Sequence, residues 1–346
     1  MPSLDAKQLK AQIKEEKFER SYFIYGEEDY LKHYYSELIA SKCVTAGMEG
    51  FNLKRFDYSQ GSTFDEVRAA SETLPAFGGY ACVVAKDYPL DSIYSSDKSA
   101  FESFLKELPD STVIIFLQDT VNVDAKRNSK YKSVIAQFQK YGAAICFDRL
   151  DVTSLAKIIM SGAAKRGCNI DRETAAYLIE TSGNDLTVLQ NETDKLCNFK
   201  NGGMITKSDI DEVCVKSLEA NVFDLSRAVM KNDGKRAFSI LHELFAEKEK
   251  PELILGTMIM AFVDMYRAKV AVSSGEKADF AAGYYNYRGR EFRLRNASYD
   301  SRNISVKTLR KNLDSLNNAD RKLKVRVTDE KIILEKLLVE LLRSEQ

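Results

Sequence analysis

The sequence has no excess of charge of either sign. Its 51 basic side chains balance 51 acidic ones over 346 residues. A chain with zero net charge has no overall field that draws it to nucleic acid, to a membrane surface or to acidic ligands. Any contact of those kinds must therefore come from a local group of residues.

Cysteine is scarce and widely spaced. There is no C-x-x-C pair, which disfavours a zinc site or a disulfide scaffold, and we expect no bound metal. The cysteines stand mostly within apolar patterns, which is typical of thiols buried as small hydrophobic side chains in a reducing compartment. The six positions are Cys43, Cys82, Cys146, Cys168, Cys197 and Cys214.

Long apolar runs are also missing. The segment "DAKQLKAQIKEEKFERS" (5–21) is charged and helix-like, and it lacks the apolar centre of a secretion signal. No uninterrupted apolar run approaches the roughly 18 residues that a membrane span requires. We therefore expect a cytoplasmic protein that makes no membrane contact.

Short runs with strand character alternate with helical patterns in the first part of the chain. Several of these runs are apolar throughout, as in strands that are covered on both faces. This alternation predicts an α/β layer built on a mainly parallel sheet. The five runs are "SYFIY" (21–25), "NLKRFD" (52–57), "YACVVA" (80–85), "TVIIFL" (112–117) and "AAICFD" (143–148).

Beyond Asp148 the strand pattern stops, and we expect only helices from 151 to 346. Pro251 suits the first turn of a helix, where a missing N–H costs nothing. The last helix, within "TDEKIILEKLLVELLR" (328–343), has acids in its first turn and a dense apolar face that requires a packing partner. That face consists of Ile333, Leu334, Leu337, Leu338 and Leu341.

The length predicts more than one domain, since domains typically have about 100–200 residues. The change of pattern places one boundary near 149. A second is expected near 214, because "MITKSDIDEVCVKS" (204–217) indicates a short capped helix that closes a middle domain. The predicted domains are 1–149, 150–214 and 215–346.

The stretch "YFIYGEEDYLKHYY" (22–35) has the outline of a phosphate-binding loop without its chemistry. A strand leads to Gly26, but Glu27, Glu28 and Asp29 follow instead of a second glycine and a Lys-Ser/Thr pair. Three carboxylates would repel a triphosphate, whereas each stabilises the start of a helix by roughly 0.3–1 kcal/mol. We expect no ATP and no other cofactor at this position.

Other catalytic patterns are weak. The run "TVIIFLQD" (112–119) resembles a Walker-B strand, but Gln118 and Asp119 replace the acidic pair that holds magnesium and activates water. The two histidines, His33 and His242, lie inside helical patterns with no nucleophile nearby in the sequence. The sequence therefore predicts no catalytic residue.

The segment "SETLPAFGGYACVV" (71–84) places apolar side chains in an irregular loop. Leu74, Ala76 and Phe77 stand among a proline and two glycines, between a helical pattern and a strand. One interpretation is that Phe77 folds back onto its own core. The other is a hydrophobic tip offered to a partner, where an anchoring phenylalanine contributes roughly 2–4 kcal/mol.

The region 285–311 is locally basic, with aromatic residues between arginines such as Arg290, Arg293 and Arg295. Such a pattern is used for contacts with the phosphate backbone of nucleic acids. A solvated helix face or a contact with another subunit explains it at least as well. Both interpretations stay open at the level of sequence.

Several segments together resemble the delta subunit of the bacterial DNA polymerase III clamp loader. No single segment is as specific as a Walker motif, but their order and spacing extend through nearly the whole chain. The segments are "YFIYGEEDYLKHYY", "LPAFGGYACVV", "DLTVLQNETDKLCNF", "ITKSDIDEVC", "NVFDLSRAVMKND", "PELILGTMIMAFVDMYRAKV" and "LNNADRKLKVRVTDEKIILEKLLVELL".

The resemblance implies a degenerate AAA+ module, a small helical lid domain and a C-terminal helical collar. It implies a non-catalytic subunit, which binds no ATP and opens the sliding clamp (beta) or holds it open while motor subunits hydrolyse ATP. The implied partners are this clamp, the motor and delta-prime subunits through the collar, and primed DNA through the complex. On its own the chain is expected to be a monomer.

The resemblance also implies a location for clamp binding. In the family the tip is an adjacent leucine and phenylalanine after a helix of the first domain. Phe77 matches the phenylalanine, whereas Ala76 stands where leucine is usual. Leu74, two residues earlier across Pro75, is a candidate for the missing apolar bulk.

Two alternatives remain from the residues themselves. One is an active AAA+ ATPase of similar architecture, which would need the phosphate-binding residues that are missing here. The other is a helical nucleic-acid-binding protein that uses the basic region 285–311.

Overall fold

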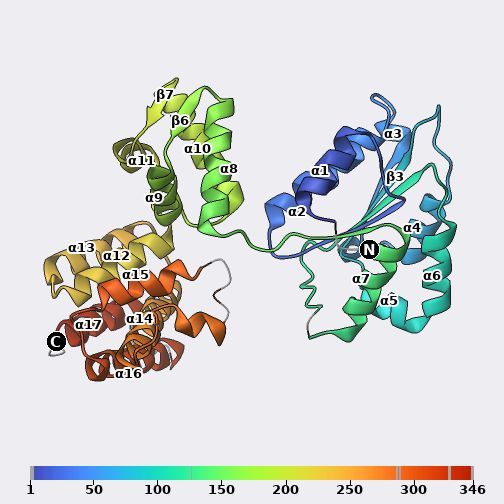
Figure 1. The fold of residues 1–346 in the computed structure, drawn as a ribbon. Helices are drawn as coiled ribbons and strands as arrows, with labels where there is room; N and C mark the ends of the chain where they lie inside the picture. The colour runs from blue at the N-terminus through green and yellow to red at the C-terminus, as the bar shows by residue number, and fades with distance from the viewer. Residues whose placement is uncertain (1–3, 126, 286, 288–289, 326–328, 344–346) are drawn as a thin grey trace. The chain divides into compact units, whose positions relative to one another are not determined.

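The computed structural model describes residues 4–125, 127–285, 287, 290–325 and 329–343 (Figure 1). The chain divides after Arg149 into two compact units, each of which is described by itself. The further division of the second unit near 214 stays a prediction. In the part of the chain that is described, no helix is long and apolar enough to cross a membrane.

The first unit is built on a five-stranded parallel sheet with the order β2-β3-β4-β1-β5. The three inner strands are buried almost throughout, as the apolar runs predict. The predicted α/β class is confirmed. The strands are β1 (Ser21–Tyr25), β2 (Leu53–Asp57), β3 (Ala81–Lys86), β4 (Thr112–Leu117) and β5 (Ala143–Cys146).

Helices cover both faces of this sheet (Figure 1). Side chains alternate between the faces along a strand, so Phe23 packs in one core while Tyr22 and Ile24 pack in the other. One face carries α1 (Ala6–Lys14) and α2 (Asp29–Cys43). The other carries α4 (Phe64–Ser71), α5 (Leu90–Ser96), α6 (Lys98–Glu107) and α7 (Ser129–Tyr141), and the short helices α3 (Glu49–Asn52) and η1 (Tyr58–Gln60) flank β2.

The second unit is mainly helical, as predicted. Its first helices are α8 (Val152–Lys165), α9 (Arg172–Ser182), α10 (Leu186–Lys200) and α11 (Lys207–Val213). Six further helices and a short 3-10 turn share one large apolar core. They are α12 (Leu218–Met230), α13 (Gly234–Ala246), α14 (Pro251–Ser273), η2 (Phe280–Gly283), α15 (Phe292–Asp300), α16 (Val306–Val325) and α17 (Glu330–Leu342).

The expectation of helices alone after Asp148 is wrong in one place. A small parallel sheet pairs β6 (Cys168–Ile170) with β7 (Gly203–Ile205). Three-residue strands are too short to show a period of two, and they form because each supplies the other's hydrogen bonds. The stretch "KNGG" (200–203) indicates only a turn, but β7 begins at Gly203.

The predicted helix details hold. Helix α14 begins at Pro251, and α11 follows an N-cap at Thr206 whose side chain accepts from the N–H of Asp209. The five apolar residues of α17 are all buried in the core that α12–α17 share. The partner that this face requires is therefore supplied within the chain.

Candidate functional site

The loop between α4 and β3 presents apolar side chains to solvent. Phe77 is 83% exposed and Leu74 is 71% exposed, whereas Ala76 is partly covered. The interpretation in which Phe77 folds back onto its own core is therefore wrong. A large ring in water is costly, which makes this loop a candidate contact surface.

The backbone of this loop is unusual at Phe77 itself. Phe77, Gly78 and Gly79 have φ values of +59°, +86° and +76°. Glycine adopts this left-handed region without strain, but a phenylalanine there costs free energy that neighbouring contacts must offset.

Asn52, at the end of α3, supplies such contacts. Its side-chain amide donates to the Ala76 carbonyl at 3.0 Å, and its Oδ1 accepts from the Ala76 N–H at 2.7 Å. Asn52 is buried and Ala76 is partly covered, so both hydrogen bonds are partly shielded from water. The residue before Phe77 is thus held on both sides of its backbone.

A second exposed ring lies beside Phe77. Phe51 is 67% exposed, and the centroid of its ring lies 6.4 Å from that of Phe77 in an edge-to-face arrangement. We call Leu74, Ala76 and Phe77 the apolar tip, and Phe51 lies beside it. The sequence gives no sign of Phe51, because no local pattern shows that it lies beside Phe77, which is 26 residues further along the chain.

The turn after β1, where a nucleotide-binding protein would wrap phosphates, is closed by the chain itself. A Cβ added at Gly26 would lie 2.2 Å from the Phe147 carbonyl oxygen, so glycine is required there by a close backbone approach. The Glu28 N–H donates to the same carbonyl at 2.9 Å. Glu27 pairs with Arg149, while the Glu28 side chain is buried.

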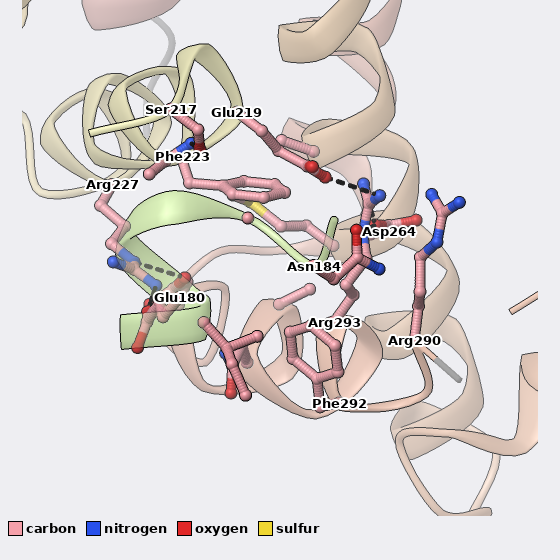
Figure 2. Close-up of a pocket in the computed structure, with 18 residues that line it drawn as sticks. Glu180, Asn184, Ser217, Glu219, Phe223, Arg227, Asp264, Arg290, Phe292 and Arg293 are labelled. Carbon is pink, nitrogen blue, oxygen red and sulfur yellow. Dashed lines mark hydrogen bonds and ion pairs between the residues drawn. The ribbon is translucent and has the colours of Figure 1, made fainter. Parts of the chain in front are cut away.

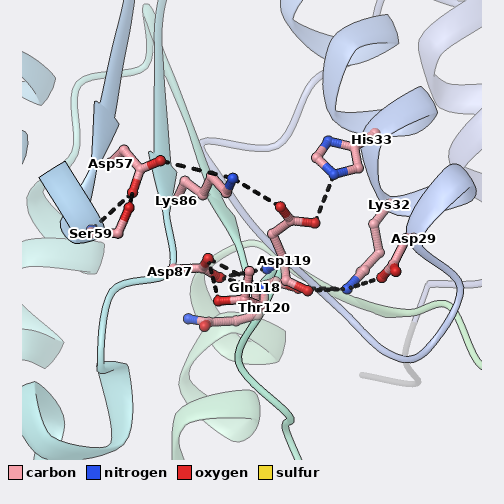
Figure 3. A network of polar contacts seen from close by, with 10 residues as sticks. All are labelled: Asp29, Lys32, His33, Asp57, Ser59, Lys86, Asp87, Gln118, Asp119 and Thr120. Atoms are coloured by element: carbon pink, nitrogen blue, oxygen red, sulfur yellow. Dashed lines mark hydrogen bonds and ion pairs between the residues drawn. The ribbon is translucent and has the colours of Figure 1, made fainter. Parts of the chain in front are cut away.

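Lys32, in the first turn of α2, is held by oxygens of its own chain (Figure 3). Lys32 Nζ is buried and donates to the Gln118 and Asp119 carbonyls, each at 2.9 Å. It also pairs with the Asp29 carboxylate at 2.9 Å. An ammonium group has three protons, so these contacts use all of them. Lys32 could not reach a phosphate without breaking contacts with its own chain.

The end of β4 is also engaged in structural contacts. Asp119 accepts from His33 Nε2 at 2.7 Å and pairs with Lys86 Nζ at 2.9 Å (Figure 3). The neighbouring Asp87 carboxylate accepts from the N–H groups of Asp119 and Thr120 at 2.6 and 3.0 Å. Within the described ranges, no three His, Cys, Asp or Glu side chains gather as a metal site requires.

These contacts affect the ionisation of Asp119. Partial burial works against its charged form, but Lys86 and His33 outweigh that effect and lower the pKa of this carboxyl. Lys86 shows the reciprocal change, since the hydrogen bond to Asp119 raises its pKa. The network therefore stabilises the fold in the ionised form of Asp119.

The predicted basic contacts lie near a small pocket of the second unit (Figure 2). Arg293 is only 9% exposed and contacts Asp264 at 3.0 Å and Glu219 at 2.9 Å. Arg295 pairs with Asp279 at 3.0 Å, and Arg290 lines the pocket. The rest of the basic stretch includes positions 286, 288 and 289, which lie outside the described residues.

The pocket is lined by α9, α12, α14 and α15 and has a volume of about 60 Å³. Sites for small ligands usually have about 300–1,000 Å³, so this one is too small for a nucleotide. At its edge Arg227 contacts Glu180 at 2.9 Å and Asp300 at 3.1 Å (Figure 2). The charged residues here join helices to one another.

Comparison with known proteins agrees with this arrangement. The family model described as "DNA polymerase III, delta subunit" matches residues 22–142. The model described as "DNA polymerase III delta subunit, C-terminal domain" matches residues 219–341. The solved Bacillus subtilis DNA clamp loader delta protein has a TM-score of 0.66 at 24% identity, and the match covers 97% of this chain and 99% of that one.

The fold is thus that of a DNA clamp-loader subunit. Among curated relatives, the DNA polymerase III subunit delta of Bacillus subtilis is 24% identical over 332 residues, covering 94% of this chain and 93% of the relative. The probable delta subunit of Aquifex aeolicus is 21% identical over 289 residues, covering 81% and 79%. The chain belongs to the family of DNA polymerase III delta subunits, and the predicted resemblance is confirmed.

Replacing the buried arginine of the pocket tests whether it is structural. We expect Arg293→Ala to lower the free energy of unfolding by about 3–5 kcal/mol, because it leaves the buried Asp264 carboxylate without its cation. The matched variant Arg295→Ala removes an exposed pair and should change it by less than about 0.5 kcal/mol. Denaturant unfolding followed by circular dichroism measures both. A stable Arg293→Ala protein that loses salt-dependent DNA affinity would contradict this role.

The Asp119 network predicts a pH dependence. Its folded-state pKa is lowered, so the stabilisation is complete above the unfolded-state value of about 3.9 and is lost as pH falls through the folded-state value. Asp119→Asn should therefore lower the melting temperature by about 2–4 °C at pH 7. The difference from wild type should shrink below about pH 4. A difference that stays constant with pH, or grows in acid, would show that ionisation of Asp119 is not involved.

Proposed function

We propose that this protein binds the DNA polymerase sliding clamp (beta) through the apolar tip and opens its ring, or holds it open, for loading onto primed DNA. The observation that carries the proposal is the exposure of Phe77 on a loop whose backbone is held by two partly buried hydrogen bonds from Asn52. A rigid, exposed aromatic side chain is the usual form of an interface anchor. Membership of the delta family supplies the identity of the partner.

Binding and opening are separate requirements. Burying Phe77 and Leu74 would contribute roughly 1.5–3 kcal/mol each to association. This free energy biases the ring only if the tip binds the open form better than the closed form. A subunit that bound both forms equally well would open nothing. The mechanism is therefore a population shift of the clamp.

The same chain is proposed to be non-catalytic. Support comes from the turn at Gly26, which lies against the Phe147 carbonyl, and from Lys32, whose protons are used by Asp29, Gln118 and Asp119. A nucleotide would have to displace these contacts and the surrounding carboxylates. This geometry disfavours the alternative of an active AAA+ ATPase. ATP hydrolysis would belong to the motor subunits of the loader.

The second unit is proposed to supply assembly. Residues 150–214 would form the lid domain and 215–346 the collar that joins the motor and delta-prime subunits. Apolar side chains on two collar helices are exposed in the single chain, among them Leu253 of α14 and Ile332 of α17. We expect these exposed side chains to pack against the motor and delta-prime subunits rather than against a second copy of this chain. The chain alone is therefore expected to be a monomer.

The nucleic-acid alternative has less support. Arg293 and Arg295, two of the arginines named for it, form ion pairs within the chain. Contact with primed DNA is therefore proposed to occur through the assembled complex.

Titration calorimetry of the full-length protein with its cognate sliding clamp tests the proposal. We expect wild type to bind and Phe77→Ala to lose about 2 kcal/mol or more, because truncation removes the central anchor. Leu74→Ala should lose less, since the side chain is smaller. Phe199→Ala, which truncates a half-exposed phenylalanine of the second unit, is the control and should bind as wild type does.

Two results would count against the proposal in different ways. If wild type binds and neither tip substitution matters, clamp binding stands but the tip is misplaced. If wild type shows no binding to the clamp, the proposed function fails.

A further inference from the structure

We infer that the clamp contact has two aromatic anchors, Phe51 and Phe77, and that Asn52 is a positioning residue that holds the second of them in its binding conformation. The inference rests on the proposed function and names the surface that the clamp must accommodate. It adds residues from α3, which precedes β2, to a loop that precedes β3.

The first observation is the placement of Phe51. It lies on a helix of only four residues, and two thirds of its surface is exposed. Its ring meets that of Phe77 at an interplanar angle of 79°. Such edge-to-face pairs contribute little while both rings remain mostly in water, so the fold gains little from the arrangement. Two adjacent exposed rings are better explained as one surface that a partner buries.

The second observation is independent of the first. Asn52 is 3% exposed, and its side-chain amide forms hydrogen bonds to both the N–H and the carbonyl of Ala76. Phe77 follows directly, with its backbone in the left-handed region. A loop held in its bound shape loses less entropy on association, which strengthens binding without any new contact. Asn52 therefore acts on the partner through Phe77.

The loop also packs closely against the chain at Gly79, after Phe77. A Cβ at Gly79 would lie 2.6 Å from the Thr45 hydroxyl, so the end of the loop is pressed against the segment that leads into α3. The segment before β2 thus supports the loop at Ala76 and at Gly79. The same segment carries Phe51.

This arrangement specifies the chemistry of the receiving surface. The clamp should offer an apolar cleft wide enough for two rings at right angles, with Leu74 at its edge. Ala76 has only a methyl side chain, and both polar groups of its backbone are hydrogen-bonded to Asn52. The ring of Phe51 then supplies apolar area that a leucine at position 76 would otherwise provide.

The test is a binding cycle with the full-length protein and the sliding clamp. Phe51→Ala should raise the dissociation constant about tenfold, as expected for an aromatic anchor in an interface. Asn52→Ala should also raise the dissociation constant about tenfold, because the tip loop is no longer held in its bound conformation. Combined with Phe77→Ala, however, Asn52→Ala should add less than about twofold, because its effect passes through the missing ring. Phe199→Ala serves again as the control.

Because Asn52 is buried, folding must be measured alongside binding. Asn52→Asp keeps the size of the side chain but places a carboxylate oxygen against the Ala76 carbonyl oxygen in a buried site, so it should lose at least as much affinity as Asn52→Ala. Circular dichroism melting shows whether each variant is folded at the binding temperature.

The outcomes separate this inference from the proposed function. If Phe77→Ala weakens binding but Phe51→Ala stays within about twofold of wild type, the second anchor is wrong and the clamp contact stands. If Asn52→Ala loses as much affinity with Phe77 absent as with it present, Asn52 does not position that ring. If Phe77→Ala itself has no effect, the proposed site fails and takes the inference with it.

Discussion

The interaction on which the account depends is the pair of hydrogen bonds between the Asn52 side chain and the backbone of Ala76. These two bonds fix the residue before Phe77, whose backbone is left-handed and whose ring is exposed. The parallel sheet serves this arrangement, because α3 and the α4–β3 loop flank the neighbouring strands β2 and β3. A scaffold that is rigid at this edge can present apolar side chains that a flexible loop would bury.

The same sheet explains what the chain has given up. Open α/β sheets usually bind ligands at the carboxyl ends of their strands. At the ends of β1 and β4, Lys32 donates to the Asp119 carbonyl and Lys86 pairs with the Asp119 carboxylate (Figure 3). These charges are satisfied within the chain. The chain's own side chains therefore occupy this end of the sheet, while the exposed rings lie on the loop between α4 and β3 and on α3.

Local pattern predicted most of the helices and strands and the irregular tip loop, but not the contacts between distant segments. The five strands of the large sheet follow from apolar runs, whereas the sequence left open whether Phe77 in the loop is exposed or folds back onto its own core; the structure shows that it is exposed. Phe51 was missed because its partner ring is 26 residues away, and β6 and β7 because three residues show no period. Arg293 suggested a phosphate contact, since its acidic partner Asp264 lies in a different helix.

The central claim is that the tip favours the open clamp, and comparing its affinity for two forms of the clamp tests this most directly. One form is the intact ring, and the other is a clamp variant whose subunit interface is disrupted so that no ring has to be opened. A tip that favours the open clamp should bind the disrupted form more tightly, because none of the binding free energy is then spent on opening. Equal affinity for the two forms would contradict it, since a ligand without preference shifts no equilibrium.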